Sequence, residues 1–165
     1  MYEYKDAGLF KRIVRRTAGT RPMAWLYERI QTPIDRFVYR VTRGKTTLSE
    51  WLSGLPVVML TTRGAKTGQQ RTQPVLALPD GDGFVLIASN FGRAHNPAWY
   101  HNLRAHPRAA TEIDGVTRVV EAHELHGTER DQLFQWCAEK YPPFLRYRAW
   151  AGARRIPVFR LDPAS

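Results

Sequence analysis

At residue 56 the chain changes its sequence pattern, and this change limits the possible folds more than any other feature. Three short runs rich in β-branched and other apolar residues follow, over residues 56–62, 71–78 and 84–89, with glycine-containing turns between them. Such runs predict an antiparallel meander. The chain has no repeated alternation of strand, helix and strand with short loops, which a parallel doubly wound sheet requires. The pattern therefore favours a closed or nearly closed antiparallel barrel.

Three more strands are expected in the second half of the chain. Residues 109–113 and 116–124 flank the turn Asp114-Gly115 and predict a hairpin, and residues 156–161 predict a last strand. With the meander they make six antiparallel strands. The expected fold is mainly β with helices, an α+β chain.

Caps and prolines predict the helices between these strands. Asn96 is expected to cap a helix that has Pro97 at its first position and runs to about residue 105. Thr128 and Asp131 are expected to cap a second helix. Two prolines end that helix near residue 141, and a short helical piece follows them.

The first 50 residues predict two helices and carry 11 Lys and Arg against 5 Asp and Glu. Residues 8–16 have the pattern of a short basic amphipathic helix, which would either contact a membrane surface or pack loosely on the core. Residues 32–41 predict a helix with a buried face formed by Ile34, Phe37, Val38 and Val41. We expect residues 1–50 to form a basic helical segment, part of the domain or appended to it, and residues 51–165 to form the barrel domain.

Length, charge and cysteine content limit the class of protein. A chain of 165 residues holds one domain, and 43% hydrophobic residues suffice for its core. The formal net charge of +10 predicts attraction to an anion, whether a nucleic acid, a lipid surface or a phosphorylated ligand. Cys137 is the only cysteine, which favours a reducing cytoplasm. We expect neither a secretory signal nor a membrane-spanning helix, because no apolar stretch is long enough.

A basic loop between two predicted strands is the first candidate for a functional site. It reads RGAKTGQQR over residues 63–71 and combines two glycines, a hydroxyl and three cations. Glycines let backbone N–H groups approach an anion, and Lys66, Thr67 and Arg71 add donors that suit a phosphate or carboxylate. An ordinary solvated hairpin turn would have a similar composition, so the loop alone leaves both interpretations open.

Two further segments place polar and aromatic residues beside the ends of elements. Residues 88–102 run from a strand end through a polar loop to a helix start, where unpaired N–H groups favour an anion. Trp99 and Tyr100 would either wall a flat ligand or belong to the core. Tyr141 and Tyr147 flank the proline break, where they would either cover a pocket as a lid or pack against the barrel.

Several common kinds of chemistry lack their sequence signals. The chain contains no GxGxxG after a strand, no P-loop, no GxSxG elbow and no HExxH. His123 and His126 have no visible third ligand, so no metal site is predicted. Cys137 shares a helix face with apolar residues, which predicts a buried and unreactive thiol.

Three longer motifs stand in the chain in a definite order: LTTRGAKTGQQRTQPV over residues 60–75, ASNFGRAHNPAWYHNL over 88–103 and KYPPFLRYRAW over 140–150. Together they resemble the deazaflavin-dependent nitroreductase family, which comprises actinobacterial-type reductases that use coenzyme F420. The resemblance spans about residues 55–163. It implies a split β-barrel of the FMN-binding-like type, in agreement with the six strands that the pattern predicts.

The resemblance also implies a site for coenzyme F420, whose tail carries a phosphodiester and several glutamates, and it makes FMN the less suitable cofactor. The basic loop would bind the tail, and the segments around residues 73–75 and 88–102 would hold the deazaflavin ring. The cofactor-binding residues implied in this way are Arg63, Lys66, Thr67, Gly68, Arg71, Gln73, Pro74, Val75, Ala88, Ser89, Asn90, Asn96, Pro97, Trp99, Tyr100 and Asn102.

The implied activity is an F420H2-dependent reductase that passes a hydride to a quinone-like, nitro or other conjugated acceptor. Ser89, Tyr141 and Tyr147 are the candidates for donating a proton or hydrogen bond to that acceptor. The chain departs from the best-known members, which reduce bicyclic nitroimidazoles, at three positions. Leu76 and Phe144 stand in place of tyrosines, and Asn90 stands where a basic residue is frequent. These changes alter the acceptor wall and leave the tail site intact.

Two functions of other classes compete with this one. The groove of a split barrel also suits a non-catalytic binder of a flavin, a tetrapyrrole or a fatty acid, but the basic loop favours a polyanionic cofactor. The net charge would suit a nucleic-acid binder, but no recognition helix or RNP-type strand is present, so no specific nucleic acid is expected. The expected partners are a small-molecule acceptor, a second copy in a homodimer and, through residues 8–16, the inner face of the plasma membrane. The expected location is the cytoplasm.

Overall fold

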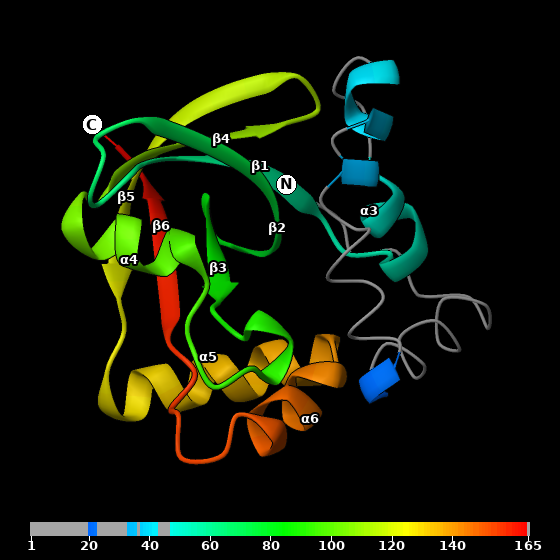
Figure 1. The fold of residues 1–165 in the computed structure, drawn as a ribbon, viewed down its shortest axis with the longest axis vertical. Helices are drawn as coiled ribbons and strands as arrows, with labels where there is room; N and C mark the ends of the chain where they lie inside the picture. The colour runs from blue at the N-terminus through cyan, green and yellow to red at the C-terminus, as the bar shows by residue number, and fades with distance from the viewer. Residues whose placement is uncertain (1–19, 23–32, 36, 43–46, 165) are drawn as a thin grey trace.

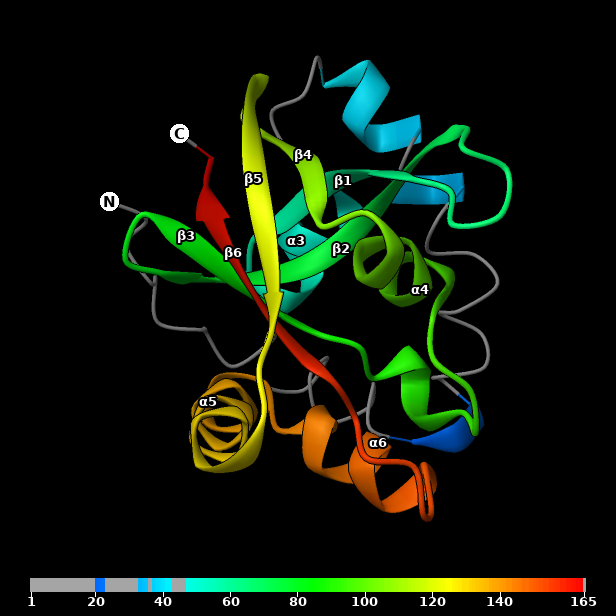
Figure 2. The same cartoon turned by 90° about the vertical axis from the view of Figure 1, so that its left-hand side faces the viewer.

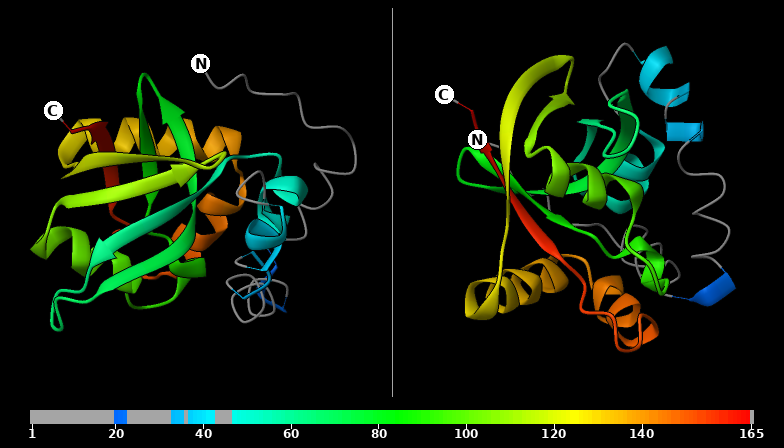
Figure 3. Two further views of the ribbon diagram at one scale, coloured as in Figure 1. Left: turned by 90° about the horizontal axis from the view of Figure 1, so that it is seen from above. Right: turned by 60° about the vertical axis from the view of Figure 1, so that its left-hand side comes forward.

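The computed structural model describes residues 20–22, 33–35, 37–42 and 47–164. Its centre is a closed barrel of antiparallel strands in the order β1-β2-β3-β6-β5-β4 (Figures 1 and 3). The strands are β1 (Val57–Arg63), β2 (Gln70–Asp80), β3 (Gly83–Ile87), β4 (Arg108–Ile113), β5 (Val116–Glu124) and β6 (Val158–Pro163). The prediction of a six-stranded antiparallel barrel with helices is therefore confirmed.

The predicted strands differ from the observed ones mainly at their ends. The last strand begins at Val158 and not at residue 156, because Pro157 has no N–H to donate to a ladder. The Pro157 carbonyl still accepts the Ala88 N–H at 2.9 Å, which continues the pairing just past the end of β3. The Asp114-Gly115 turn joins β4 to β5 as predicted, with Ile113 opposite Val116.

Five helical elements accompany the barrel in the described residues. They are α3 (Leu48–Ser53), the 3₁₀ turn η1 (Asn90–Gly92), α4 (Ala98–Ala105), α5 (Gly127–Lys140) and α6 (Pro143–Trp150). Residues 21–22, 33–35 and 37–41 are also helical.

The predicted helix caps are wrong. The N-cap of α4 is Pro97, and the Asn96 side chain binds Arg154 instead. Helix α5 begins at Gly127 with His126 as its N-cap, two residues earlier than expected, so Thr128 and Asp131 lie inside it. Asp131 there accepts hydrogen bonds from two arginines, which hold the pKa of its carboxyl below the ordinary value. A polar residue before an apolar run caps a helix only when its side chain has no stronger hydrogen-bond partner than the backbone N–H groups of the first turn.

Two hydrophobic cores lie on opposite sides of the barrel wall, because side chains alternate along each strand. Along β2, Val75 and Ala77 face the barrel interior, which residues of α4 close at one end. Leu76 and Leu78 face outward into a second core, formed against α5 and α6. Figure 2 shows these two helices side by side beneath the barrel. The barrel thus carries one layer of helices on its outer face and one helix at its mouth.

The N-terminal part of the described chain attaches near α3 and the β4–β5 turn. The Asp35 carboxylate accepts the Ser49 N–H at 2.9 Å. Burial and the neighbouring Glu112 carboxylate raise the pKa of Tyr39 to about 12. The prediction of a buried helical face is wrong for Phe37 and Val41, which are 66% and 65% exposed. Helical spacing identifies an apolar face, but it does not decide whether another element covers it.

The predicted basic helix at residues 8–16 lies outside the described residues. The division of the chain at residue 50 stays a prediction, and α3 runs across it. In the described ranges, no helix has both the length and the apolar character needed to cross a membrane.

Candidate functional site

The basic loop forms a closed turn between β1 and β2. The Gly64 N–H donates to the Gln69 carbonyl and the Gly68 N–H donates to the Gly64 carbonyl, each at 2.8 Å. Gly68 has φ +67°, a conformation that glycine adopts without strain. The residues from 65 to 71 are exposed, so the cationic side chains of this turn reach solvent.

Asn102 of α4 holds the basic loop on the barrel through two hydrogen bonds of its side-chain amide. Its side chain is only 8% exposed, and its Oδ1 accepts the Ala65 N–H at 3.0 Å. Its Nδ2 donates to Thr62 Oγ1, on β1, at 2.9 Å. Both ends of the amide are therefore used within the protein. Asn102, which the sequence assigned to the cofactor site, holds the basic loop on the barrel mouth through these contacts.

Replacing Asn102 with alanine is expected to lower the free energy of unfolding by about 1 to 3 kcal/mol, because the buried Thr62 hydroxyl and the more exposed Ala65 N–H lose their hydrogen-bond partner. Denaturant unfolding monitored by tryptophan fluorescence measures the change. The control is Gln135→Ala, which removes an exposed amide from α5. Equal stability of the two variants would show that Asn102 does not secure the loop.

Trp99 and Tyr100 belong to the barrel core. Their rings pack edge-to-face on Phe159 with centroids 6.0 and 5.9 Å apart, and they are 6% and 7% exposed. The Tyr100 hydroxyl accepts a hydrogen bond from Arg104 at 3.2 Å. The structure therefore favours the core interpretation of these aromatic residues, and their contact with a cofactor stays a prediction.

The polar segment after β3 makes an unusual turn. Asn90, Phe91 and Gly92 are consecutive residues with positive φ, at 47°, 53° and 76°. The Gly92 N–H donates to the Ser89 carbonyl at 2.9 Å, and the Asn90 amide donates to the His95 carbonyl at 2.9 Å. Left-handed backbone is unfavourable for residues other than glycine. The turn at residues 90–92 therefore needs support from its surroundings.

Helix α6 gives this support from one side. A Cβ atom on Gly92 would lie 2.8 Å from the Tyr147 carbonyl oxygen and from the Trp150 Cβ. The Phe91 ring meets the Tyr147 ring edge-to-face at 5.8 Å. Tyr147 is 3% exposed in this cluster, whereas Tyr141 is partly exposed and packs on Phe144 at 5.0 Å. The second and third sequence motifs thus meet at one aromatic cluster.

Arg154 gives support from the other side, and the sequence analysis missed it. Its guanidinium donates to the carbonyls of Ala88, Ser89 and Arg93 at 3.1, 2.6 and 2.8 Å, and to Asn96 Oδ1 at 2.6 Å. Partial burial lowers the pKa of this side chain from its ordinary value. The bonded groups are 58 to 66 positions away along the chain, so no local pattern could have indicated them.

The predicted ring-binding residues on β2 divide between two faces. Gln73 shares the face of Val75, toward the barrel interior, and Pro74 shares the outward face of Leu76. In Figure 2 the β1–β2 turn, α4 and the green turn at residues 90–92 lie on the same side of the molecule. The structure therefore gathers the three motifs on one side but gives their β2 residues two orientations.

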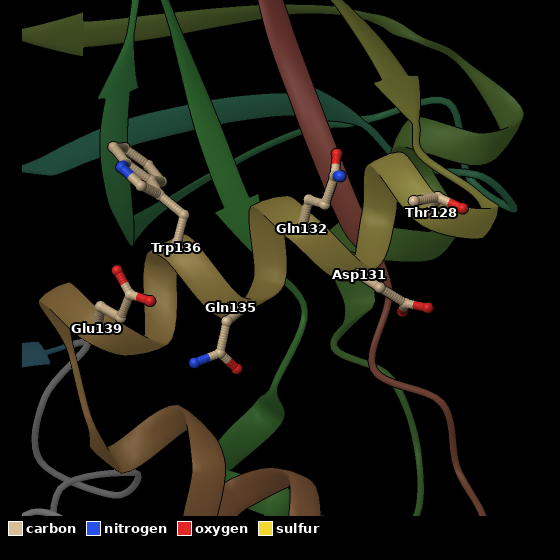
Figure 4. Close-up of a pocket in the computed structure, with 6 residues that line it drawn as sticks. All are labelled: Thr128, Asp131, Gln132, Gln135, Trp136 and Glu139. Carbon is tan, nitrogen blue, oxygen red and sulfur yellow. The ribbon is translucent and has the colours of Figure 1, made fainter.

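A separate hollow of about 490 Å³ lies along α5 (Figure 4). All of its lining residues come from that one helix: Thr128, Asp131, Gln132, Gln135, Trp136 and Glu139. None of them belongs to the three motifs. Within the described ranges, no group of three or more His, Cys, Asp or Glu residues is placed to hold a metal ion.

Cys137 faces away from that hollow into the outer core. It is fully buried, and burial raises the pKa of its thiol to about 12. Because the thiolate is the reactive form, we expect Cys137 to resist a thiol reagent such as DTNB in the native protein and to react after unfolding. Reaction of the folded protein at the rate of a free thiol would contradict this placement.

Comparison with known proteins gives a consistent result. The model of the family described as F420H(2)-dependent quinone reductase matches residues 33–163. An F420H(2)-dependent quinone reductase of Mycobacterium tuberculosis is 34% identical over 140 residues, which are 81% of this chain and 93% of the relative. A solved F420-H2 dependent reductase, FDR-A, is 32% identical with a TM-score of 0.59, over 65% of this chain and 94% of its own. A solved chain described as a domain-swapped dimer is 29% identical with a TM-score of 0.62, over 86% and 99%.

Proposed function

The chain belongs to the F420H(2)-dependent quinone reductase family, and we propose that it transfers a hydride from reduced coenzyme F420 to a quinone-like acceptor beside the basic loop and the turn at residues 90–92. The main support for this proposal is the basic loop, which is an exposed cationic turn that Asn102 fixes to the barrel. A bound deazaflavin would have carbon where a flavin has N5, so it would supply a hydride and would be a poor carrier of single electrons.

The basic loop fits the polyanionic tail of this cofactor. Residues 63–71 contain three cations and no carboxylate. Arg71 donates to the Gln69 side chain at 2.9 Å, and the Arg63 guanidinium lies 3.7 Å from where a Cβ of Gly68 would stand. These contacts keep both guanidinium groups at the turn, where they would meet a phosphodiester or glutamate carboxylate. Lys66, Thr67 and the Gly68 backbone would complete the anion site.

We propose that the deazaflavin ring binds to the remaining residues that the family resemblance implied. The backbone of residues 88–90 would hold one edge of the ring in position. The Asn102 amide would act through the basic loop, because both of its ends are already bonded. The other residues of this assignment are Gln73, Pro74, Val75, Asn96, Pro97, Trp99 and Tyr100.

Ser89, Tyr141 and Tyr147 are the proposed hydrogen-bond or proton donors to the reduced acceptor. A phenol with a pKa of ~10 donates a hydrogen bond at neutral pH without being ionised. Tyr141 is the more exposed of the two tyrosines, so its hydroxyl is the better placed to meet an acceptor that enters from solvent.

The outward face of β2 at Leu76 is apolar. Leu76 is partly exposed and packs against the outer core, whereas Phe144, at 3% exposure, lies within that core. These residues offer no hydroxyl to a nitro group. A flat, conjugated and largely apolar quinone therefore suits this face better than a bicyclic nitroimidazole.

We further propose three features of the whole chain. Residues 1–50 form part of the domain, because Asp35 contacts Ser49 of α3 and Tyr39 lies beside Glu112. The protein forms a homodimer, as the relative described as a domain-swapped dimer suggests. Residues 8–16, which are outside the described ranges, bind the inner face of the plasma membrane, where a lipophilic quinone would be met. Flotation with anionic liposomes, with and without residues 1–19, tests the last of these.

An anaerobic assay tests the proposed activity. Oxidation of F420H2 by the full chain is followed by absorbance with menadione as acceptor, and reduced FMN and NADPH replace F420H2 in parallel. After the rate without protein is subtracted from each reaction, we expect enzyme-dependent oxidation by menadione for F420H2 and not for reduced FMN or NADPH. If F420 binds but is not turned over with any quinone tested, the chain is a non-catalytic binder. If F420 does not bind, the proposed site is wrong.

A further inference from the structure

Arg154 contacts the proposed ring site at four points, although it lies outside the three motifs. It lies in the connection between α6 and β6, and its own N–H donates to the Ala151 carbonyl at 3.2 Å. Its guanidinium forms four hydrogen bonds, and all four acceptors lie in the segment of residues 88–96. One side chain therefore joins the start, the middle and the end of that segment.

The positions of the acceptors explain what this contact does. The Ala88 and Ser89 carbonyls lie immediately before the left-handed turn at residues 90–92, and the Arg93 carbonyl and the Asn96 amide lie after it. The turn is thus clamped at both ends by one rigid group. Gly92 packs against α6 with no space for a Cβ atom, and the Phe91 ring packs on Tyr147, so the turn itself is fixed as well.

We infer that Arg154 is a positioning residue that holds Ser89 and the turn at residues 90–92 in the geometry required for hydride transfer. This inference rests on the proposed function. Arg154 donates to three backbone carbonyls and one amide, and these bonds leave the guanidinium little freedom to reach the cofactor itself. It acts on the reaction through the backbone of residues 88–96.

These four hydrogen bonds require the planar, forked guanidinium group of arginine. Three nitrogens of the guanidinium serve four acceptors that surround it in different directions. A lysine ammonium keeps the charge, but it has a single nitrogen on a flexible stem and cannot reproduce this fork. Lysine at this position should therefore restore the charge without restoring the geometry.

The test compares Arg154→Ala, Arg154→Lys and the control Arg155→Ala in the full chain. Arg155 is the next residue and carries the same charge, but it pairs with Asp131 on the surface of α5. Three quantities are measured: the Kd for F420 at fixed salt, the single-turnover rate of F420H2 oxidation by menadione, and hydrogen exchange over residues 88–96.

We expect Arg154→Ala to lower the single-turnover rate by about 10- to 100-fold, the effect of misplacing reacting groups by a fraction of an ångström to one ångström. The Kd should change by less than about threefold, because the charged tail bound at the basic loop would supply most of the affinity and residues 88–90 would meet only one edge of the ring. Amide exchange should accelerate at residues 88–96 and not at the β1–β2 turn. Methylguanidinium added to Arg154→Ala should restore part of the rate, and Arg154→Lys should remain slow.

Each result decides for or against the inference. If wild-type protein binds F420 and turns over while Arg154→Ala and Arg154→Lys keep its rate, the inference is wrong and the proposed function stands. If wild-type protein fails to bind F420, the proposed function itself fails. Should Arg154→Ala not fold, Arg154→Lys carries the test: a slow rate with a normal Kd supports the clamp, and a normal rate overturns it. A rate loss in Arg155→Ala equal to that in Arg154→Ala would also overturn it.

Discussion

Replacing Lys66 and Arg71 together by alanine is expected to weaken F420 binding by at least about 100-fold at low salt. Each residue would supply a charge-assisted hydrogen bond to the anionic tail, worth roughly 1.5 to 3 kcal/mol. Both side chains are exposed, so salt screens their attraction and the difference between variant and wild type should narrow as ionic strength rises. Fluorescence titration with F420 at two salt concentrations measures both effects.

The matched control for this double variant is Arg118→Ala with Arg155→Ala. Both arginines are exposed, Arg118 on β5 and Arg155 beside Asp131 of α5, away from the basic loop, and their removal lowers the net charge by the same amount. The control should bind F420 within about threefold of wild type at physiological salt. If both double variants lose affinity equally, the net charge of the chain attracts the cofactor and the basic loop is not a site.

Gly92→Ala is expected to lower the free energy of unfolding by about 2 to 5 kcal/mol. The added methyl would stand 2.8 Å from the Tyr147 carbonyl oxygen and from the Trp150 Cβ, so α6 or the turn must shift. Overpacking typically costs about 1 to 3 kcal/mol, and alanine at φ +76° adds about 1 to 2 kcal/mol. The melting temperature should fall by roughly 5 to 20 °C in a chain of this size. Single-turnover activity should fall with it, because Ser89 borders the displaced turn.

Gly81→Ala separates the two causes of this loss. Gly81 has φ +60°, and a Cβ there would meet nothing within 4 Å. This control carries the same backbone cost without the clash, so we expect a loss of only about 1 to 2 kcal/mol and unchanged activity. If Gly92→Ala is no less stable than Gly81→Ala, the contact between α6 and the turn at residues 90–92 is looser than described.

The barrel could be predicted because its signals are local. Alternating apolar runs and glycine turns specify strands and hairpins within a few residues, and the order of six strands then leaves few antiparallel closures. The resemblance to F420-dependent reductases is confirmed for the same reason, since each motif is a continuous segment. The buried Cys137 was also correctly predicted, from its place on an apolar helix face.

The sequence could not predict contacts between distant segments. Asn96 has the chemistry of a helix cap, but Arg154 offers its amide oxygen a charged donor, and the cap position falls to Pro97. Asn102 has the chemistry of a ligand-binding residue, but its amide is used between β1 and the basic loop. Arg154 itself lies just beyond the third motif, and only the folded chain shows that its guanidinium turns toward residues 88–96.

Hydride transfer by this chain is tested by the single-turnover oxidation of F420H2 by menadione on the full chain under anaerobic conditions, with hydrogen or deuterium at C5 of the reduced cofactor. We expect enzyme-dependent oxidation that is slower with deuterium, because the bond to that atom breaks in the hydride transfer. Two results would contradict hydride transfer by this chain. The first is a rate of oxidation no higher than the rate without protein. The second is a rate that is the same with hydrogen and deuterium and that changes instead with oxygen or added FMN.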